Sequence, residues 1–229
     1  MDQLADVLKN GLVPDIFKME RAYDLLMAIG ENVSVLNSRE TGNFGELFGA
    51  FQIALETEAI LAVSRVYDKP DKRYPTRCIQ RALDLLEHHS KDMPEIVELH
   101  NTKLACQFMG EGHAVLVALD QGREEFIACL VQYYRELLAS SEVTSQIELL
   151  KNIRDKRLAH NELAEPMGPT WGSLKSLITH TQNFVGILGW AFFGTVYIHD
   201  GKYFLSNDAK RPSLALARLS KLLNQSGMR

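Results

Sequence analysis

Apolar residues recur every three or four positions along most of this chain, and this spacing constrains the fold more than any other feature. Residues spaced in this way share one face of an α-helix, so a sustained stripe predicts a helix with one buried face. The stripe within residues 44–68 comprises Leu47, Phe48, Phe51, Leu55, Ala59, Ala62, Val63 and Val66. The Asp68-Lys69-Pro70-Asp71 sequence ends it, because proline disfavours the helical conformation at the residue before it.

The same spacing predicts helices over most of the remaining sequence. Ser140 and Thr170 are suitable N-caps, because their hydroxyl oxygens can accept hydrogen bonds from the first backbone N–H groups of a helix. The predicted helices cover one or two segments within 1–37 separated at Gly11 and Pro14, then 76–89, a segment opening at Met93-Pro94-Glu95, 112–139 with a break at Gly122, 142–160, 170–193 and 213–224.

One segment has a different pattern. Val196-Tyr197-Ile198-His199 and Lys202-Tyr203-Phe204-Leu205 flank Asp200-Gly201, and an Asp-Gly pair between such runs predicts a tight β-hairpin. A lone hairpin is marginally stable in water, so we expect it to pack on helices. No internal repeat or low-complexity linker is present. The sequence therefore predicts an all-α fold with a small β-hairpin near residues 196–205, in a single domain over residues 1–229.

Composition excludes several classes of protein. A net charge of −4 argues against a protein that coats nucleic acid non-specifically, although a local basic patch remains compatible with it. Three widely spaced cysteines are typical of reduced thiols, so we expect no disulfide frame and no metal site. We also expect no cofactor, since Gly110-Glu111-Gly112 is too short for a phosphate-binding glycine loop. The apolar stretch 184–198 is interrupted by glycines and too short to span a bilayer, and the N-terminus has no basic region before an apolar run. We therefore expect a cytoplasmic protein that does not bind membranes.

The residues that indicate a chemistry lie in Arg154-Asp155-Lys156-Arg157-Leu158-Ala159-His160. An arginine is always charged and can stabilise a phosphate, and a histidine with a pKa near 6.5 can move a proton at neutral pH. The carboxylate of Asp155 can hold the guanidinium of Arg154 in one orientation. The cations Lys151, Arg154, Lys156 and Arg157 also make the segment locally basic.

Spacing alone carries little weight, because Arg81 also precedes His88 by seven positions and lies in an ordinary amphipathic segment. The alternative reading of residues 154–160 is a solvated helix end, where cations complement the negative end of the helix dipole. Two features favour the functional reading. Asp155 directly follows the arginine, and Pro166 and Pro169 break the chain shortly after the motif, so that its side chains can face a cleft.

The stretch Ile153-Arg154-Asp155-Lys156-Arg157-Leu158-Ala159-His160 resembles the signature of the HEPN superfamily (higher eukaryotes and prokaryotes nucleotide-binding), and most of all its AbiU-type branch, named for phage abortive infection. Ser64-Arg65-Val66-Tyr67-Asp68-Lys69 resembles the end of a helix in that branch. The resemblance covers about residues 20–195, with a C-terminal hairpin and helix at 196–229. It implies a helical bundle that dimerises, metal-independent endoribonuclease activity as a toxin, and in many systems a nucleotidyltransferase-type antitoxin as partner.

The residue chemistry agrees with what the resemblance implies, because RNA carries its own nucleophile in the 2′-hydroxyl. We expect His160 to act as general acid or base, Arg154 to stabilise the phosphate, Asp155 to orient it, and Lys151, Lys156, Arg157 and Asn161 to contact RNA. On an ideal helix Arg154 and His160 lie roughly 120° apart and about 9 Å along the axis. Either the helix is distorted near His160 or two copies form a composite site. Arg157 shares the face of His160 better and could assist or replace Arg154. The alternative function is a non-catalytic HEPN-like module that binds a nucleotide or a protein partner.

Overall fold

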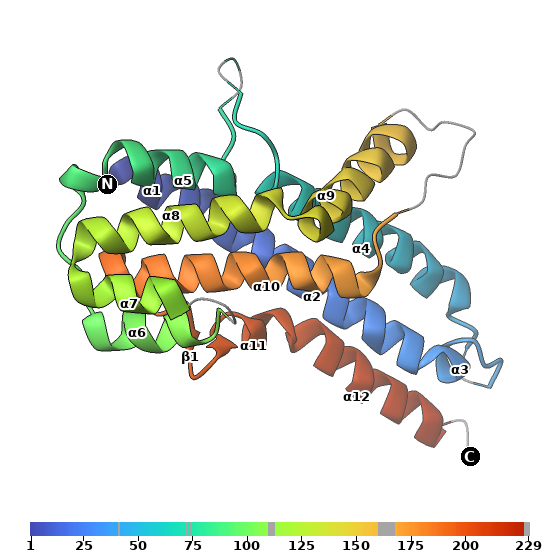
Figure 1. Cartoon of the computed structure of the whole chain (residues 1–229). Helices are drawn as coiled ribbons and strands as arrows, with labels where there is room; N and C mark the ends of the chain where they lie inside the picture. Colours follow the sequence, from blue (N-terminus) through green and yellow to red (C-terminus); the bar gives the residue numbers. More distant parts are fainter. Residues whose placement is uncertain (41, 72, 74, 110–112, 160–167, 227–229) are drawn as a thin grey trace. The chain divides into compact units, whose positions relative to one another are not determined.

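The computed structural model describes the chain except for residues 41, 72, 74, 110–112, 160–167 and 227–229 (Figure 1). The described residues are 78% helical, and the strands among them form one two-stranded sheet. The all-α prediction is therefore confirmed.

The chain divides into two compact units. Unit 1 comprises Met1–Ile16 and Val63–Phe204, and unit 2 comprises Phe17–Ala62 and Leu205–Arg229. The boundaries fall within α2 (Val13–Glu31) and α4 (Gly45–Val66). The single-domain organisation remains a prediction.

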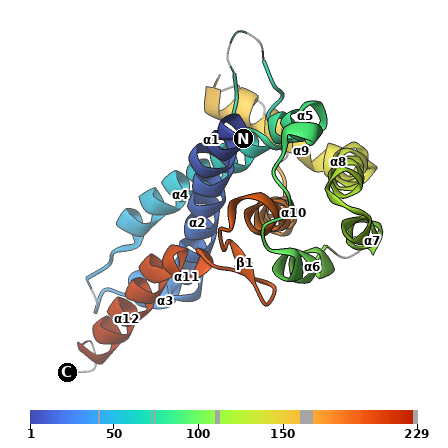
Figure 2. The same ribbon diagram turned by 90° about the vertical axis from the view of Figure 1, so that its left-hand side faces the viewer.

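The long helix α10 (Trp171–Leu188) runs through the core of unit 1. Its buried face includes Leu177, Phe184 and Leu188, and the ring of Phe184 packs edge-on against that of Tyr134, with centroids 4.7 Å apart. Figure 2 shows α6, α7 and α8 around one side of α10. The helical elements of this unit are α1 (Asp2–Val7), η1 (Leu8–Leu12), α5 (Ile79–His88), η2 (Ser90–Asp92), α6 (Leu99–Gln107), α7 (His113–Gln121), α8 (Arg123–Ala139), α9 (Ser141–Ile153), η3 (Arg154–Ala159), α10 and η4 (Gly189–Phe193).

The predicted caps and the predicted break are present. The Ser140 hydroxyl accepts a hydrogen bond from the Val143 N–H at the start of α9, and the Thr170 hydroxyl accepts one from the Ser173 N–H at the start of α10. Gly122 separates α7 from α8 with φ of 129°, a conformation that side chains rarely adopt. The helix ends predicted from these local sequence signals therefore agree with the structure.

The predicted hairpin is also confirmed. Strands β1 (Ile198–His199) and β2 (Lys202–Tyr203) pair antiparallel, and the turn residues Asp200 and Gly201 have φ of 47° and 69°. Two positive φ values are typical of the turns that join short hairpins. The hairpin packs on α10 where Gly186 has no side chain, since a Cβ there would lie 2.5 Å from Ile198 Cγ2.

Two predictions about helix boundaries are wrong. The segment after Met93 does not open a helix, and α6 begins at Leu99, because tertiary contacts hold residues 93–97 in another conformation. Arg123 donates to the Met93 carbonyl at 2.7 Å, and the Val97 N–H donates to the Ala191 carbonyl at 2.8 Å.

The N-terminal segment is also not interrupted at Gly11 and Pro14. The helical path continues from α1 through the π-helical turn η1 into α2. A Cβ on Gly11 would clash with the Arg77 side chain, so this glycine allows close packing. Pro14 directly follows the π-helical turn η1 as the second residue of α2.

Unit 2 contains Phe17–Glu31 of α2, α3 (Val33–Leu36), the first part of α4, α11 (Ser206–Ala209) and α12 (Arg211–Ser226). The helix predicted over 213–224 is thus α12. Its Leu216 lies in a small core with Ala28, Ile29 and Leu36, against which Phe48 and Leu55 pack. Arg21 and Glu58 form a salt bridge of 2.7 Å within this unit.

α4 is the one described helix that is long and apolar enough to cross a membrane. The apolar stretch 184–198 is therefore not the sole sizeable one among the described residues. Length and composition are weak indications, because core helices of soluble proteins also satisfy them.

Candidate functional site

Arg154, the first residue of the motif, lies where α9 changes its helical geometry. α9 buries Val143, Leu150 and Ile153, and at Arg154 the chain continues as the π-helix η3. π-helical turns are rare and occur frequently at functional sites. The described turn at Arg154–Ala159 thus departs from ordinary α-helical geometry, while His160 itself lies outside the described residues, and the choice between a distorted helix and a composite site stays open.

Arg154 is held by two carboxylates. Its Nε donates to Asp155 Oδ1 at 2.8 Å, and its Nη1 lies 3.8 Å from Asp68 Oδ1. The hydrogen bond that Arg154 donates to Asp155 raises the pKa of Arg154, burial opposes this effect, and the charge of Asp68 adds to the rise. With 28% of its side chain exposed, the guanidinium remains charged and accessible to a ligand.

Asp68 is the residue of this site that the sequence did not reveal. It lies two residues after the last residue of α4, and the intervening Tyr67 fixes this helix end to α10. The Tyr67 hydroxyl donates to the Leu177 carbonyl at 2.5 Å and accepts from the Thr181 hydroxyl at 3.1 Å. Burial raises the pKa of Tyr67 and keeps its hydroxyl protonated. The available sequence signal was an acidic residue at a helix end stopped by Pro70, within a segment that resembles the family.

A second ion pair supports the same helix end. Arg65 donates from Nε and Nη2 to the carboxylate of Asp15, with the shortest contact at 2.6 Å. The Asp15 side chain is 8% exposed. A planar guanidinium bound to a buried carboxylate through two nitrogens allows little rotation. Asp68 therefore projects from a helix end that is fixed on two sides.

The other predicted site residues are only partly described. Lys151 on α9 and Lys156 on η3 flank Arg154 in the sequence, and both side chains are partly exposed. The Arg157 side chain, His160 and Asn161 lie outside the described part of the chain. The structure thus brings Arg154, Asp155 and Asp68 together and leaves the roles of the other residues as predictions.

The Arg81 and His88 pair has ordinary surface interactions. Arg81 donates to Gln3 Oε1 at 3.0 Å, and His88 Nδ1 lies 2.7 Å from the Asp84 carbonyl oxygen. This agrees with its reading as a chance spacing.

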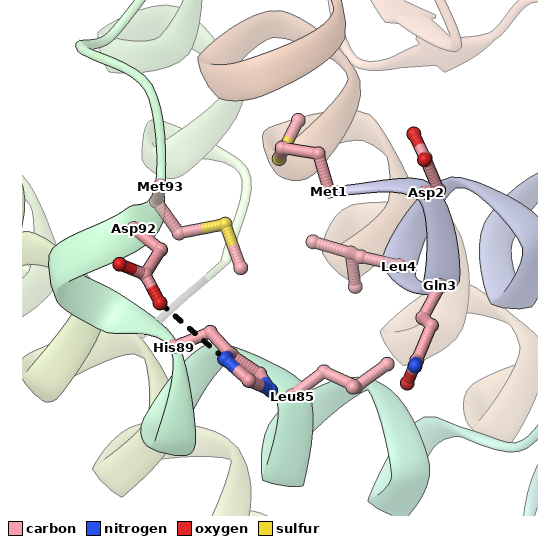
Figure 3. A pocket seen from close by; sticks show the side chains of 8 residues that line it. All are labelled: Met1, Asp2, Gln3, Leu4, Leu85, His89, Asp92 and Met93. Carbon is pink, nitrogen blue, oxygen red and sulfur yellow. Dashed lines mark ion pairs between the residues drawn. The ribbon is translucent and has the colours of Figure 1, made fainter.

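Two cavities found among the described residues are not lined by residues of the motif. Figure 3 shows a cavity of about 290 Å³ between the N-terminal residues and α5, where His89 faces Asp92 at 3.5 Å. A larger hollow of about 580 Å³ lies between α5 and α8 beside Arg135. Among the described residues, no group of three or more His, Cys, Asp or Glu side chains could hold a metal ion.

Comparison with known proteins decides the family. The model of the HEPN AbiU2 family matches residues 2–213. The chain belongs to this family. No curated protein and no solved structure matches it. The AbiU2 match extends beyond the expected 20–195 at both ends, and it identifies the chain as a HEPN-type abortive-infection module.

Proposed function

We propose that this AbiU2 protein is a metal-independent endoribonuclease whose site is built around Arg154 and His160. The observation that carries the proposal is the arginine of the family motif, charged and part-exposed at a π-helical turn, with Asp155 and Asp68 beside its guanidinium. Orientation of this kind suits a group that must meet a phosphate in one geometry.

The reaction uses the 2′-hydroxyl of RNA as nucleophile. The 2′-oxygen bonds to the adjacent phosphorus, and the bond from phosphorus to the 5′-oxygen breaks. A base takes the 2′-proton and an acid gives a proton to the departing 5′-oxygen. The products are a 2′,3′-cyclic phosphate and a 5′-hydroxyl. His160 serves as the proton-transfer group, since an imidazole can act in either role near neutral pH.

Arg154 stabilises the negative charge that gathers on the non-bridging phosphate oxygens. Its Nε is occupied by Asp155, which leaves the Nη donors for the phosphate. The contact of Nη1 with Asp68 is long, at 3.8 Å, so a phosphate oxygen can replace it at small cost. Asp155 therefore orients the arginine while the Nη groups bind substrate.

The site is shared between two copies of the chain in a homodimer. A twofold axis places each motif opposite its copy, which allows Arg154 of one protomer to work with His160 of its partner. Lys151, Lys156, Arg157 and Asn161 contact the RNA backbone beside the scissile phosphate. The activity belongs to a cytoplasmic abortive-infection effector that is restrained by a nucleotidyltransferase-type antitoxin.

Cleavage of RNA in excess EDTA tests the proposal. We expect wild type to cleave and His160→Ala to lose about 100-fold or more in rate, the usual contribution of a proton-transfer group. His88→Ala is the matched control, because His88 is exposed and its Nδ1 contacts the Asp84 carbonyl oxygen within α5, and it should retain wild-type activity. Equal activity of wild type and His160→Ala would refute the assignment.

A further inference from the structure

The loop between α4 and α5 is strongly basic in a chain that is acidic overall. Residues 69–77 contain Lys69, Lys72, Arg73 and Arg77 against the single carboxylate of Asp71. In the described part of this loop, Lys69 and Arg73 are exposed. Figure 1 shows it in teal between the two helices. None of these cations belongs to the Arg154–His160 motif.

The loop begins at the candidate site. Asp68 Oδ1, which lies 3.8 Å from Arg154 Nη1, also accepts the Lys69 backbone N–H at 3.0 Å. One carboxylate oxygen thus contacts both the candidate phosphate-binding arginine and the first residue of the loop. Adjacent Cα atoms are about 3.8 Å apart, so Lys69 is fixed within one residue of the carboxylate that adjoins Arg154.

The far end of the loop is fixed as well. The Thr76 hydroxyl donates across the neck to the Lys69 carbonyl at 3.3 Å. Arg77 Nε donates to Asp6 Oδ2 at 2.8 Å, and this hydrogen bond lowers the pKa of Asp6 and raises that of Arg77. Arg77 therefore anchors the loop to α1 although its side chain is exposed, and the same loop also carries the exposed side chains of Lys69 and Arg73.

We propose that Lys69 and Arg73 bind the backbone phosphates of a single RNA strand that flank the phosphate held by Arg154. The inference rests on the proposed function and adds a substrate-binding element to it. Lysine carries its charge on a flexible four-carbon stem and arginine on a forked guanidinium, and both bind phosphate. Such contacts recognise the sugar–phosphate chain and not the bases, so the loop contributes affinity without sequence preference.

The dependence of RNA affinity on salt concentration measures how many phosphates the protein contacts. Each phosphate neutralised on a single strand contributes about −0.7 to the slope of log K against log salt concentration. The probe is fluorescein-labelled oligouridine, and anisotropy is measured in EDTA on the full chain carrying His160→Ala, which prevents cleavage. In that background we expect Lys69→Ala with Arg73→Ala to make the slope shallower by roughly 1.4.

The matched control is Lys91→Ala with Lys202→Ala in the same background, which removes the same charge from exposed positions on η2 and β2. We expect its slope to equal that of the parent. An unchanged slope in the loop variant, or an equal change in both variants, would overturn the inference. So would a parent protein that does not bind the oligonucleotide.

Failure of the loop inference and failure of the proposed function give different results. If the loop variant binds like its parent while the wild type still cleaves in EDTA, the loop assignment alone is wrong. If the loop variant changes the slope while the wild type does not cleave, the loop binds RNA and the ribonuclease proposal is wrong. Circular dichroism of both double variants checks that neither loses helix.

Discussion

Replacing Tyr67 with phenylalanine tests how the end of α4 is held. The Tyr67 hydroxyl lies in the interior and makes two hydrogen bonds, one to the Leu177 carbonyl and one from the Thr181 hydroxyl. Tyr67→Phe removes both and leaves the ring packing intact. It therefore isolates the contribution of these hydrogen bonds to the free energy of unfolding.

The expected loss follows from the partners that remain. Without the Tyr67 hydroxyl, the single proton of the Thr181 hydroxyl is available to the Leu177 carbonyl, which lies 3.0 Å away, so neither group is left wholly unsatisfied. A net intramolecular hydrogen bond contributes about 0.5–1.5 kcal/mol. We therefore expect Tyr67→Phe to lower the free energy of unfolding by about 1–2 kcal/mol, or to lower Tm by roughly 2–4 °C for each kcal/mol in a chain of this size.

Urea unfolding followed by circular dichroism measures this loss. The control is Tyr197→Phe, whose hydroxyl makes no hydrogen bond to the described residues and whose removal should change the free energy by less than about 0.5 kcal/mol. Thr181→Val combined with Tyr67→Phe should cost less than the sum of the two single changes, because they share a hydrogen bond. A loss for Tyr67→Phe no larger than that of Tyr197→Phe, with additive effects in the cycle, would refute this account of the helix end.

Two further predictions concern α10. Gly186→Ala should destabilise the protein by roughly 1–3 kcal/mol, because the new Cβ would meet Ile198 of the hairpin. Gly49→Ala, at an uncrowded position in the middle of α4, should stabilise it by up to about 1 kcal/mol. Thermal unfolding measures both changes, and a change in stability of the same sign for both variants would contradict the packing. Burial lowers the pKa of His180, with Glu142 opposing the shift. The unfolded chain therefore binds a proton more readily below about pH 6.5, and stability should fall as pH drops from 7 to 5. His180→Gln should reduce that fall, as measured by urea titrations at both pH values, and an identical fall in wild type and variant would exclude this contribution.

Most helices were predictable because apolar periodicity and hydroxyl caps act locally. Ser140 and Thr170 marked helix starts through their capping hydroxyls, Gly122 marked one through its positive φ, and Asp200-Gly201 specified the hairpin turn. The error at Met93 has a non-local cause, since Arg123 and Ala191 hold that segment by contacts from elsewhere in the chain. Proline was compatible with the first turn of a helix there, and only tertiary structure decided against it.

The candidate site was predictable only in part for the same reason. Arg154 and Asp155 are neighbours in sequence, and their pairing followed from residue chemistry. Asp68 reaches Arg154 only because Tyr67 and Arg65 attach the end of α4 to α10 and α2. The π-helical geometry at Arg154 also has no signature in the apolar stripe, since the period of that stripe predicts an ordinary α-helix through the motif.

The chemical ends of the RNA products test the central claim most directly. Wild type, Arg154→Ala and His160→Ala are incubated with a defined RNA in excess EDTA, and the products are identified by mass spectrometry. The account predicts 2′,3′-cyclic phosphate and 5′-hydroxyl ends from wild type and strongly reduced cleavage by both variants. Products with 5′-phosphate ends, or cleavage that EDTA abolishes, would contradict it.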